Sequence, residues 1–285
     1  MGSFKVSPTD KSFPPALKNI ASPPKQLYVL GELEQLLNSR VVSIVGSRAV
    51  TPYGRQVTTK LAGELAGKGI TIVSGLAIGV DALAHQAALE AGGYTVAVLP
   101  SSVDHVYPAS NQQLAQRIID SGGALISEYD GPIESYKSNF IARNRLVSGL
   151  ADVLLITEAS DHSGTLHTAN FALEQGKTVM AVPGNITSAN SVGTNRLIKA
   201  GALPVTEASD VLQALGITQK TSDQAVVAAN SDEALILDQL SQGVSDVAEL
   251  QQTSGLSAEK FNQVLTMLEI TGKIHPLGNG HWGLN

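Results

Sequence analysis

The sequence predicts an α/β fold with a largely parallel sheet, followed by a small, mainly helical domain. Three observations lead to this prediction. Short apolar runs alternate with amphipathic stretches of helical length between residues 41 and 183. A polar segment of small residues follows at 217–231, and the pattern after it is helical. Because strands that alternate with helices form βαβ units, we expect a parallel sheet that is covered on both faces.

Six apolar runs have the length and composition of buried strands. Each is rich in β-branched residues and ends in Gly, Pro, Ser or another polar residue. They lie at 41–46, 70–75, 94–100, 124–128, 152–157 and 178–183. Stretches with a helical pattern separate them, such as 54–69 and 81–93. In a sheet of this kind, functional residues gather at the carboxyl ends of the strands, near the point where the strand order reverses.

The segments on either side of this region differ from it in composition. Residues 1–25 contain five prolines and no periodicity, which indicates an arm or linker. We therefore expect the sheet domain over 26–216, a linker over 217–230 and a last domain over 231–285. That last domain has three helical patterns and then a Gly-Asn-Gly sequence able to turn a hairpin. This order indicates a winged-helix-like module.

Composition restricts the classes of function. The chain has no cysteine, which excludes disulfides and thiolate metal sites and fits a reducing compartment. Aromatic residues make up only 4%, so we expect no broad aromatic stacking surface. The N-terminus has no apolar signal segment and no run reaches the length of a membrane span. We expect a cytoplasmic protein that makes no membrane contact.

The net charge of −6 is unevenly distributed along the chain. Residues 38–215 hold 12 Lys and Arg against 14 acids, so a local arginine patch is compatible with this region. Residues 216–285 hold three lysines against eight acids, a balance of −5. On charge alone the C-terminal domain is a poor phosphate binder. We expect it to bind protein rather than DNA.

The first predicted strand runs into a turn of Gly46, Ser47 and Arg48. Glycine allows a tight turn, the amides of a following helix N-terminus attract an anion, and Arg48 can clamp that anion. A plain strand-to-helix turn with a surface arginine is the alternative. The G-x-G-x-x-G fingerprint of dinucleotide-binding proteins is absent. We expect neither NAD nor another cofactor.

The second predicted strand is followed by a turn that Gly75 and Gly79 bracket. This spacing predicts another phosphate-sized pocket beside the first. Asp81 falls in the first turn of the next helix, where a capping role explains it better than ligand binding. His85 lies four residues later on the same helix face. With no third ligand at suitable spacing, we expect no metal site.

A third turn of this kind follows the fifth predicted strand. Ser163, Gly164 and Thr165 place hydroxyl groups and a small residue at a helix start. This is again an anion-binding geometry. The sequence therefore predicts three phosphate-sized turns at one edge of the sheet.

The stretch "FIARNRLVSGL" at 140–150 places Arg143 and Arg145 on either side of Asn144. Two residues apart on one helix, the arginines would point about 200° from each other. Both can serve one ligand only at a helix N-terminus or in an irregular turn, which Asn144 suits. One arginine would then reach a phosphate while the other holds neighbouring loops.

The alternative for both arginines is a structural role. Each would then form an ion pair with a nearby acid such as Asp152 or Glu158. For Arg143, the presence of Lys137 upstream on the same loop favours a functional role. Our hypothesis is that the Arg-Asn-Arg segment, together with Arg48, reaches into one pocket that holds a phosphate.

In their order along the chain, these motifs resemble the DNA-processing protein A family. The resemblance covers about residues 26–215. The matching pieces are "GSR" (46–48), "SGLAIGVDALAH" (74–85), "VYP" (106–108), "ISEY" (126–129), "FIARNRLVSGL" (140–150), "SGTLHTANFAL" (163–173), "VPG" (182–184) and "GTNRLIKAGA" (193–202).

The resemblance implies an extended Rossmann-like parallel sheet with a small C-terminal winged-helix-like domain. It implies a homodimer that binds single-stranded DNA without cleaving it and helps load the RecA recombinase during uptake of transforming DNA. In that family the Gly-Ser-Arg turn and the Arg-Asn-Arg segment help line the DNA-binding pocket. The corresponding residues here are Gly46, Ser47, Arg48, Arg143, Asn144 and Arg145.

An enzyme is the alternative. A related Rossmann-like family hydrolyses the N-glycosidic bond of nucleoside monophosphates and resembles this chain at the Gly-Thr helix start. Its pattern places a glutamate just after that Gly-Thr, whereas this chain has Leu166, His167 and Thr168, and its next acid is Glu174. Because the general acid/base is missing from that position, we expect a binding protein and no catalysis.

Overall fold

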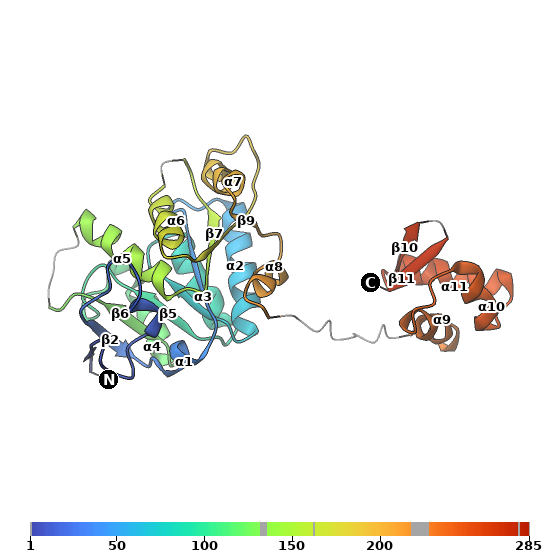
Figure 1. Cartoon of the computed structure of the whole chain (residues 1–285), viewed down its shortest axis with the longest axis horizontal. Coiled ribbons are helices and arrows are strands. Elements are labelled where there is room, and N and C mark those ends of the chain that lie inside the picture. The colour runs from blue at the N-terminus through green and yellow to red at the C-terminus, as the bar shows by residue number, and fades with distance from the viewer. Residues whose placement is uncertain (1, 132–135, 162, 218–227, 279, 285) are drawn as a thin grey trace. The chain divides into compact units, whose positions relative to one another are not determined.

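The computed structural model describes residues 2–131, 136–161, 163–217, 228–278 and 280–284. The chain divides into two compact units, Met1–Thr218 and Gln219–Asn285, and each is described by itself (Figure 1). Within the described ranges, no helix is both long enough and apolar enough to cross a membrane.

The first unit is built on a sheet to which the described residues contribute nine strands. The strands lie in the order β1-β2-β6-β5-β4-β3-β7-β8-β9. All neighbours from β6 to β9 pair in parallel, and β1 and β2 add an antiparallel edge. The predicted α/β class is confirmed, and the six predicted strands correspond to β3–β8. The strands are β1 (Phe4–Val6), β2 (Leu27–Gly31), β3 (Val41–Gly46), β4 (Thr71–Ser74), β5 (Thr95–Val98), β6 (Ala124–Ser127), β7 (Val153–Glu158), β8 (Thr178–Ala181) and β9 (Leu203–Pro204).

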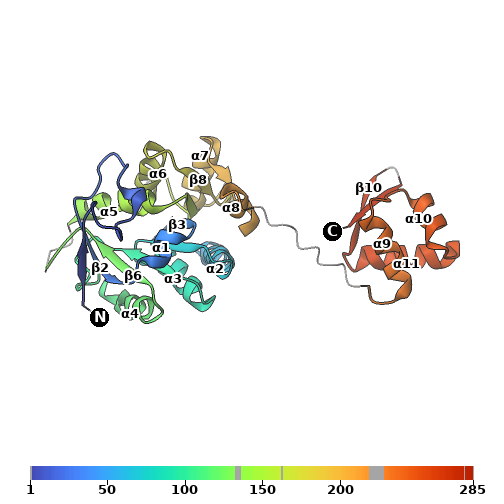
Figure 2. The same cartoon turned by 60° about the horizontal axis from the view of Figure 1, so that its bottom comes forward.

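Helices cover both faces of this sheet (Figure 2). In β3, Val42 and Ile44 pack on one face, and Val41 and Val45 pack on the other, because successive strand residues alternate in direction. The first face carries α2 (Pro52–Gly67), α3 (Val80–Glu90), α4 (Gln112–Asp120) and α8 (Ala208–Ala214). The second carries α1 (Glu34–Asn38), α5 (Lys137–Leu150), α6 (Thr165–Glu174) and α7 (Val192–Lys199).

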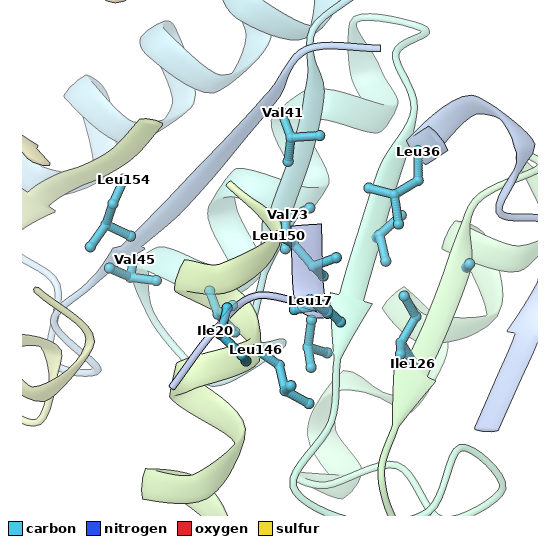
Figure 3. Close-up of a cluster of buried hydrophobic side chains, with 14 of the residues drawn as sticks. Leu17, Ile20, Leu36, Val41, Val45, Val73, Ile126, Leu146, Leu150 and Leu154 are labelled. Carbon is cyan, nitrogen blue, oxygen red and sulfur yellow. The ribbon is translucent and has the colours of Figure 1, made fainter. Parts of the chain in front are cut away.

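The N-terminal segment belongs to this unit. Strand β1 pairs with β2, and the short 3-10 helix Pro15–Leu17 brings Leu17 and Ile20 against α5 beside Leu146 (Figure 3). A Cβ placed on Gly149 would lie 2.9 Å from the Leu17 side chain, so the two segments approach closely. The prediction of an arm over residues 1–25 is therefore wrong. Its prolines interrupt regular structure, but the apolar residues between them are buried.

The second unit has the elements expected of a winged-helix-like module. Its described residues form α9 (Ser231–Ser241), α10 (Val247–Ser254), α11 (Ala258–Ile270) and a hairpin of β10 (Ile274–Gly278) and β11 (His281–Leu284). Side chains of Asn230, Asp246 and Ser257 accept hydrogen bonds from the first amides of the three helices, as N-caps do. Of the predicted linker over 217–230, residues 218–227 lie outside the described ranges.

The strand order locates the functional edge of the first unit. From β3 the chain proceeds through β4, β5 and β6 on one side, and then through β7, β8 and β9 on the other. The order therefore reverses between β3 and β7, and ligands of such sheets bind outside the carboxyl ends of the strands at this point. Here the Ser47 N–H donates to the Glu158 carbonyl at 2.9 Å. The Gly-Ser-Arg turn thus stands at the reversal point.

Candidate functional site

The Gly-Ser-Arg turn presents a cation together with aromatic rings. Arg48 is exposed, and its Cζ lies 5.2 Å from the centroid of the Phe140 ring, a cation–π contact. The Phe140 ring meets Tyr107 edge-on, with centroids 5.5 Å apart. Tyr107 is 49% exposed. Charge and aromatic surface therefore meet at one place on the edge of the sheet.

Sequence reasoning missed Phe140 and Tyr107 as site residues. The low aromatic content of the chain argued against a broad stacking surface, but a count of aromatic residues does not show where they lie. Phe140 is the first residue of the "FIARNR" motif, which lies within α5, and Tyr107 lies in the "VYP" motif. The signal available was the presence of an aromatic residue in each of two motifs that carry the family resemblance.

The N-terminus of α2 already holds an anion, and that anion belongs to the protein. The Glu158 carboxylate accepts a hydrogen bond from the Thr51 N–H at 3.1 Å and another from the Thr51 hydroxyl. Glu158 is only 3% exposed and packs against Gly54 in the first helical turn. A carboxylate of the protein therefore lies at the start of α2, next to the turn predicted to attract an external anion.

The turn at 75–79 is also closed by a carboxylate. Asp81 is 8% exposed, and its Oδ2 accepts the N–H of Gly75 at 3.1 Å and that of Ala77 at 3.4 Å. Asp81 thus has a structural role, but it closes the turn at 75–79 and makes no side-chain cap of α3. Gly79 has φ +85° and Leu76 has φ +55°, so the turn has a special backbone shape that these bonds stabilise.

Arg143 lies beneath this turn rather than on the surface. It is 4% exposed, and its Nη1 donates to the carbonyl oxygens of Gly75 and Val98, at the carboxyl ends of β4 and β5. Burial lowers the pKa of Arg143 to about 10, with the opposing charge of Asp81 raising it. The group therefore remains a cation at neutral pH. Its bonds join two strand ends below the exposed site.

Arg145 points to a different part of the molecule. Its guanidinium forms two hydrogen bonds with Glu128, at 2.6 and 2.7 Å. Because α5 is a continuous helix, residues two apart on it face different directions. The expectation that Arg145 reaches the same pocket as Arg48 is wrong. The alternative for Arg145 was an ion pair with a nearby acid. Such a pair is present, but the partner is Glu128 rather than Asp152 or Glu158.

Three further predicted positions lie in α5 and at the start of α6. Asn144 accepts a hydrogen bond from the Arg143 Nε at 3.3 Å, so it sits within α5 rather than in an irregular turn. Lys137 begins α5, and its side chain lies outside what the structure describes. The turn Ser163–Thr165 leads into α6, and its Ser163 hydroxyl donates to the Thr165 hydroxyl at 2.9 Å.

A groove of about 620 Å³ lies beside this edge, between the start of α2 and the segment that follows β8. The Tyr53 hydroxyl donates to the Pro183 carbonyl at 2.7 Å across it. The groove begins three residues after Arg48 along the chain. Its lining residues are Thr51, Pro52, Tyr53, Pro183, Gly184, Asn185, Ser188 and Ser191.

Comparison with protein families decides the relationship that the motifs indicate. Residues 5–216 match the family described as DNA recombination-mediator protein A. The chain belongs to the DNA recombination-mediator protein A family. Residues 220–280 match the DprA winged helix domain, which agrees with the three helices and hairpin described in the second unit. The resemblance stated from the motifs is confirmed, and so is the two-part fold.

Several members of the family are similar to this chain over about three quarters of its length. Protein Smf of Escherichia coli K12 is 42% identical over 209 residues, which are 73% of this chain and 56% of Smf. The DNA processing protein DprA of Bacillus subtilis is 38% identical over 207 residues, which are 73% of this chain and 69% of that protein. The match thus spans little more than half the length of Smf.

Two solved structures of family members share the fold. The X-ray structure of DprA from Streptococcus pneumoniae has a TM-score of 0.69 at 38% identity and covers 73% of each chain. DprA from Helicobacter pylori has a TM-score of 0.68 at 35% identity, covering 75% of this chain and 95% of that one. The Helicobacter structure is described as giving insight into a unique single-stranded DNA binding mode.

Proposed function

We propose that this family member binds single-stranded DNA at the carboxyl edge of its parallel sheet, without cleaving it. The observation that carries the proposal is the exposed Arg48 guanidinium resting on the Phe140 ring at the reversal point of the sheet. A phosphate and an adjacent base need a cation and an apolar face side by side. The single-stranded DNA binding described for the Helicobacter relative supports the same ligand.

Phosphates are held by side chains rather than by helix amides. Because Glu158 lies at the start of α2 and Asp81 accepts two amides of the second turn, Arg48 supplies the principal cation, and Lys137 a second. The Ser163–Thr165 turn offers hydroxyl groups at the same edge. With three or four phosphate contacts, log K against log salt falls with a slope of roughly −2 to −3.

Bases stack on the two aromatic side chains. Phe140 and Tyr107 come from separate segments and stand edge-to-face, so a base lying on one ring also meets the edge of the other. Stacking on an aromatic side chain contributes about 1–3 kcal/mol per base and tolerates any sequence. The site is therefore expected to bind single strands with little sequence preference.

We further propose that the protein acts as a homodimer and helps load the RecA recombinase onto single-stranded DNA, in DNA uptake and recombination. Membership of the recombination-mediator family supports this role. Light scattering measures the dimer. The rate at which RecA displaces a single-strand-binding protein from DNA, with and without this chain, measures the loading. An unchanged rate would contradict the role in RecA loading.

The position of Glu174 disfavours the hydrolase alternative. Glu174 ends α6, whereas the Gly-Thr turn begins it. Ten helical residues separate the two by roughly 15 Å. A general acid/base has to lie within hydrogen-bond reach of the scissile bond, so Glu174 does not serve a substrate held at Gly164.

The proposal is tested by the anisotropy of a fluorescent single-stranded oligonucleotide at several salt concentrations. Arg48→Ala is expected to weaken binding and to reduce the salt slope by about 0.7, the value of one phosphate contact on a single strand. Arg117→Ala is the matched control, because Arg117 is exposed in the last turn of α4, at the opposite edge of the sheet. Equal affinity of Arg48→Ala and wild type, at equal thermal stability, would refute this site.

A further inference from the structure

The turn at 75–79 lies directly against the backbone that carries Arg48. The Val80 N–H donates to the Ser47 carbonyl at 3.1 Å. A Cβ placed on Gly79 would lie 2.7 Å from the Arg48 carbonyl oxygen and 2.8 Å from its Cα. Only a residue without a Cβ fits at this position, so the turn packs directly against the Arg48 backbone. A shift of the turn would therefore shift the Arg48 backbone as well.

On its other side the same turn rests on Arg143. A Cβ placed on Gly75 would lie 2.6 Å from the Arg143 Cζ, so the guanidinium packs flat against the start of the turn. It also donates to the Gly75 carbonyl, while Asp81 accepts the Gly75 and Ala77 amides. Gly75 is thus held by its carbonyl and by its amide, by two side chains of opposite charge.

The burial of these charges is costly, which indicates that their geometry matters. Asp81 and Arg143 are both more than nine-tenths buried. Burial raises the pKa of Asp81 even though the charge of Arg143 opposes the shift. An arginine with this exposure cannot reach a surface phosphate without giving up the carbonyls of Gly75 and Val98, and buried unpaired carbonyls are expensive.

We propose that Arg143 and Asp81 are positioning residues that hold the turn at 75–79 against Ser47 and Arg48, and so aim the Arg48 side chain at the DNA. The inference rests on the proposed single-stranded DNA site. It differs from a direct contact of Arg143 with a phosphate, because Arg143 then acts only through Arg48.

A double-mutant cycle separates the two roles. Arg143→Lys keeps the charge but loses the planar fork that reaches two carbonyls. It is expected to weaken single-strand binding roughly fivefold, within the range of coupling in a hydrogen-bonded network. The salt slope is expected to lie between those of the wild type and Arg48→Ala, because a misdirected Arg48 loses part of its phosphate contact. In the Arg48→Ala background, Arg143→Lys is expected to cause no further loss.

Gly79→Ala tests the same inference with every charge intact, and it carries the test should Arg143→Lys fail to fold. Its Cβ would push the turn away from Ser47 and Arg48. Gly69→Ala is the matched control, since Gly69 has φ +78° and open space around it, against φ +85° at Gly79. Gly79→Ala is expected to weaken binding, and Gly69→Ala to leave binding unchanged. Thermal melts report the folding of each variant.

Three outcomes would overturn the inference. Losses that add fully in the double variant would show that Arg143 contacts phosphate itself. Wild-type affinity in both Arg143→Lys and Gly79→Ala would show that DNA binding does not depend on how the turn is held. Wild-type affinity of Arg48→Ala would refute the DNA site and the positioning role together, and this result is distinct from the other two.

Discussion

The two units differ in whether they present an exposed cation beside an aromatic ring. The α/β unit presents Arg48 exposed beside an aromatic ring. In the winged-helix unit, both described lysines are paired with acids, Lys260 with Asp232 at 2.8 Å and Lys273 with Glu233 at 2.6 Å. The winged-helix fold is the one better known for DNA binding, yet both lysines that the structure describes in this unit are neutralised by acids. We therefore expect phosphate binding to follow the placement of charge rather than the fold.

The same contrast separates three arginines within the α/β unit. Arg145 is held by Glu128, Arg143 is buried under a turn, and Arg48 is exposed. All three stand in motifs that carry the family resemblance, yet each has a different environment. A motif identifies which residues matter, and the surroundings decide whether a residue contacts the ligand or supports one that does.

The largest expected effect distinguishes the two units by pH. His85 is fully buried beside Arg143, and burial lowers its pKa to about 3 from the ordinary 6.5. Between these values the unfolded chain binds a proton that the folded α/β unit does not. The free energy of unfolding of this unit should therefore fall by about 1.4 kcal/mol for each pH unit as the pH drops from 6.5 toward 3.

The winged-helix unit should respond only at lower pH. The Ala229 amide and Lys273 lower the pKa of Glu233 below its ordinary 4.5, so this carboxylate stabilises the unit above that pH and ceases to do so as the pH falls through the lowered value. Trp282 is the single tryptophan of the chain and packs in this unit. In urea unfolding at pH 7, 6 and 5, tryptophan fluorescence follows the winged-helix unit and circular dichroism follows both units, so a transition seen only by circular dichroism belongs to the α/β unit.

The variant His85→Gln isolates the histidine. Burial raises the pKa of Asp81, so Asp81 contributes with the opposite sign and destabilises as the pH rises. The difference between wild type and His85→Gln removes this shared contribution. A pH slope equal in the two proteins would show that His85 is not the group responsible.

The next effect concerns the aromatic surface. Phe140→Ala should weaken single-strand binding by about tenfold, toward the lower end of the stacking range, and leave the salt slope unchanged because no charge is removed. Met267→Ala is the matched control, since Met267 is an apolar side chain 47% exposed on α11 of the other unit. Anisotropy titrations at two salt concentrations compare them. An equal loss of affinity in Phe140→Ala and Met267→Ala would show that Phe140 has no specific role in base stacking.

Much of the fold could be predicted because its signal is local. Strands β3–β8 are short apolar runs ended by turn residues, and the helices between them have a regular apolar period. The N-terminal segment escaped prediction because its prolines hide the burial of Leu17 and Ile20, which depends on contact with α5. That contact joins residues more than a hundred positions apart.

The site was predicted only in part, for the same reason. The Gly-Ser-Arg turn at the end of a strand and the structural role of Asp81 follow from neighbours along the chain. The anion at the start of α2 is Glu158, which lies 107 positions from Thr51. The partner of Arg145 is Glu128, 17 positions away and on a strand end. Spacing shows which side chains are available, but not which of them pair across the sheet.

The smallest expected effect is that of removing the winged-helix unit. A chain ending at residue 217 should bind single-stranded DNA within about twofold of the full chain. The deleted part carries three lysines against eight acids, and its two described lysines are already paired, so few counterions are released by it on binding. Anisotropy with one oligonucleotide measures the two chains side by side, and melts confirm that the shorter one is folded.

A variant of the full chain makes this last comparison sharper. Lys260→Gln removes the more exposed of the two paired lysines without deleting any backbone. If the winged-helix unit contributes nothing to phosphate binding, the affinity and the salt slope should both match those of the wild type. A salt slope reduced by about 0.7 would mean that Lys260 leaves Asp232 to contact a phosphate. The two units would then differ in the strength of their phosphate contacts rather than in whether they make any.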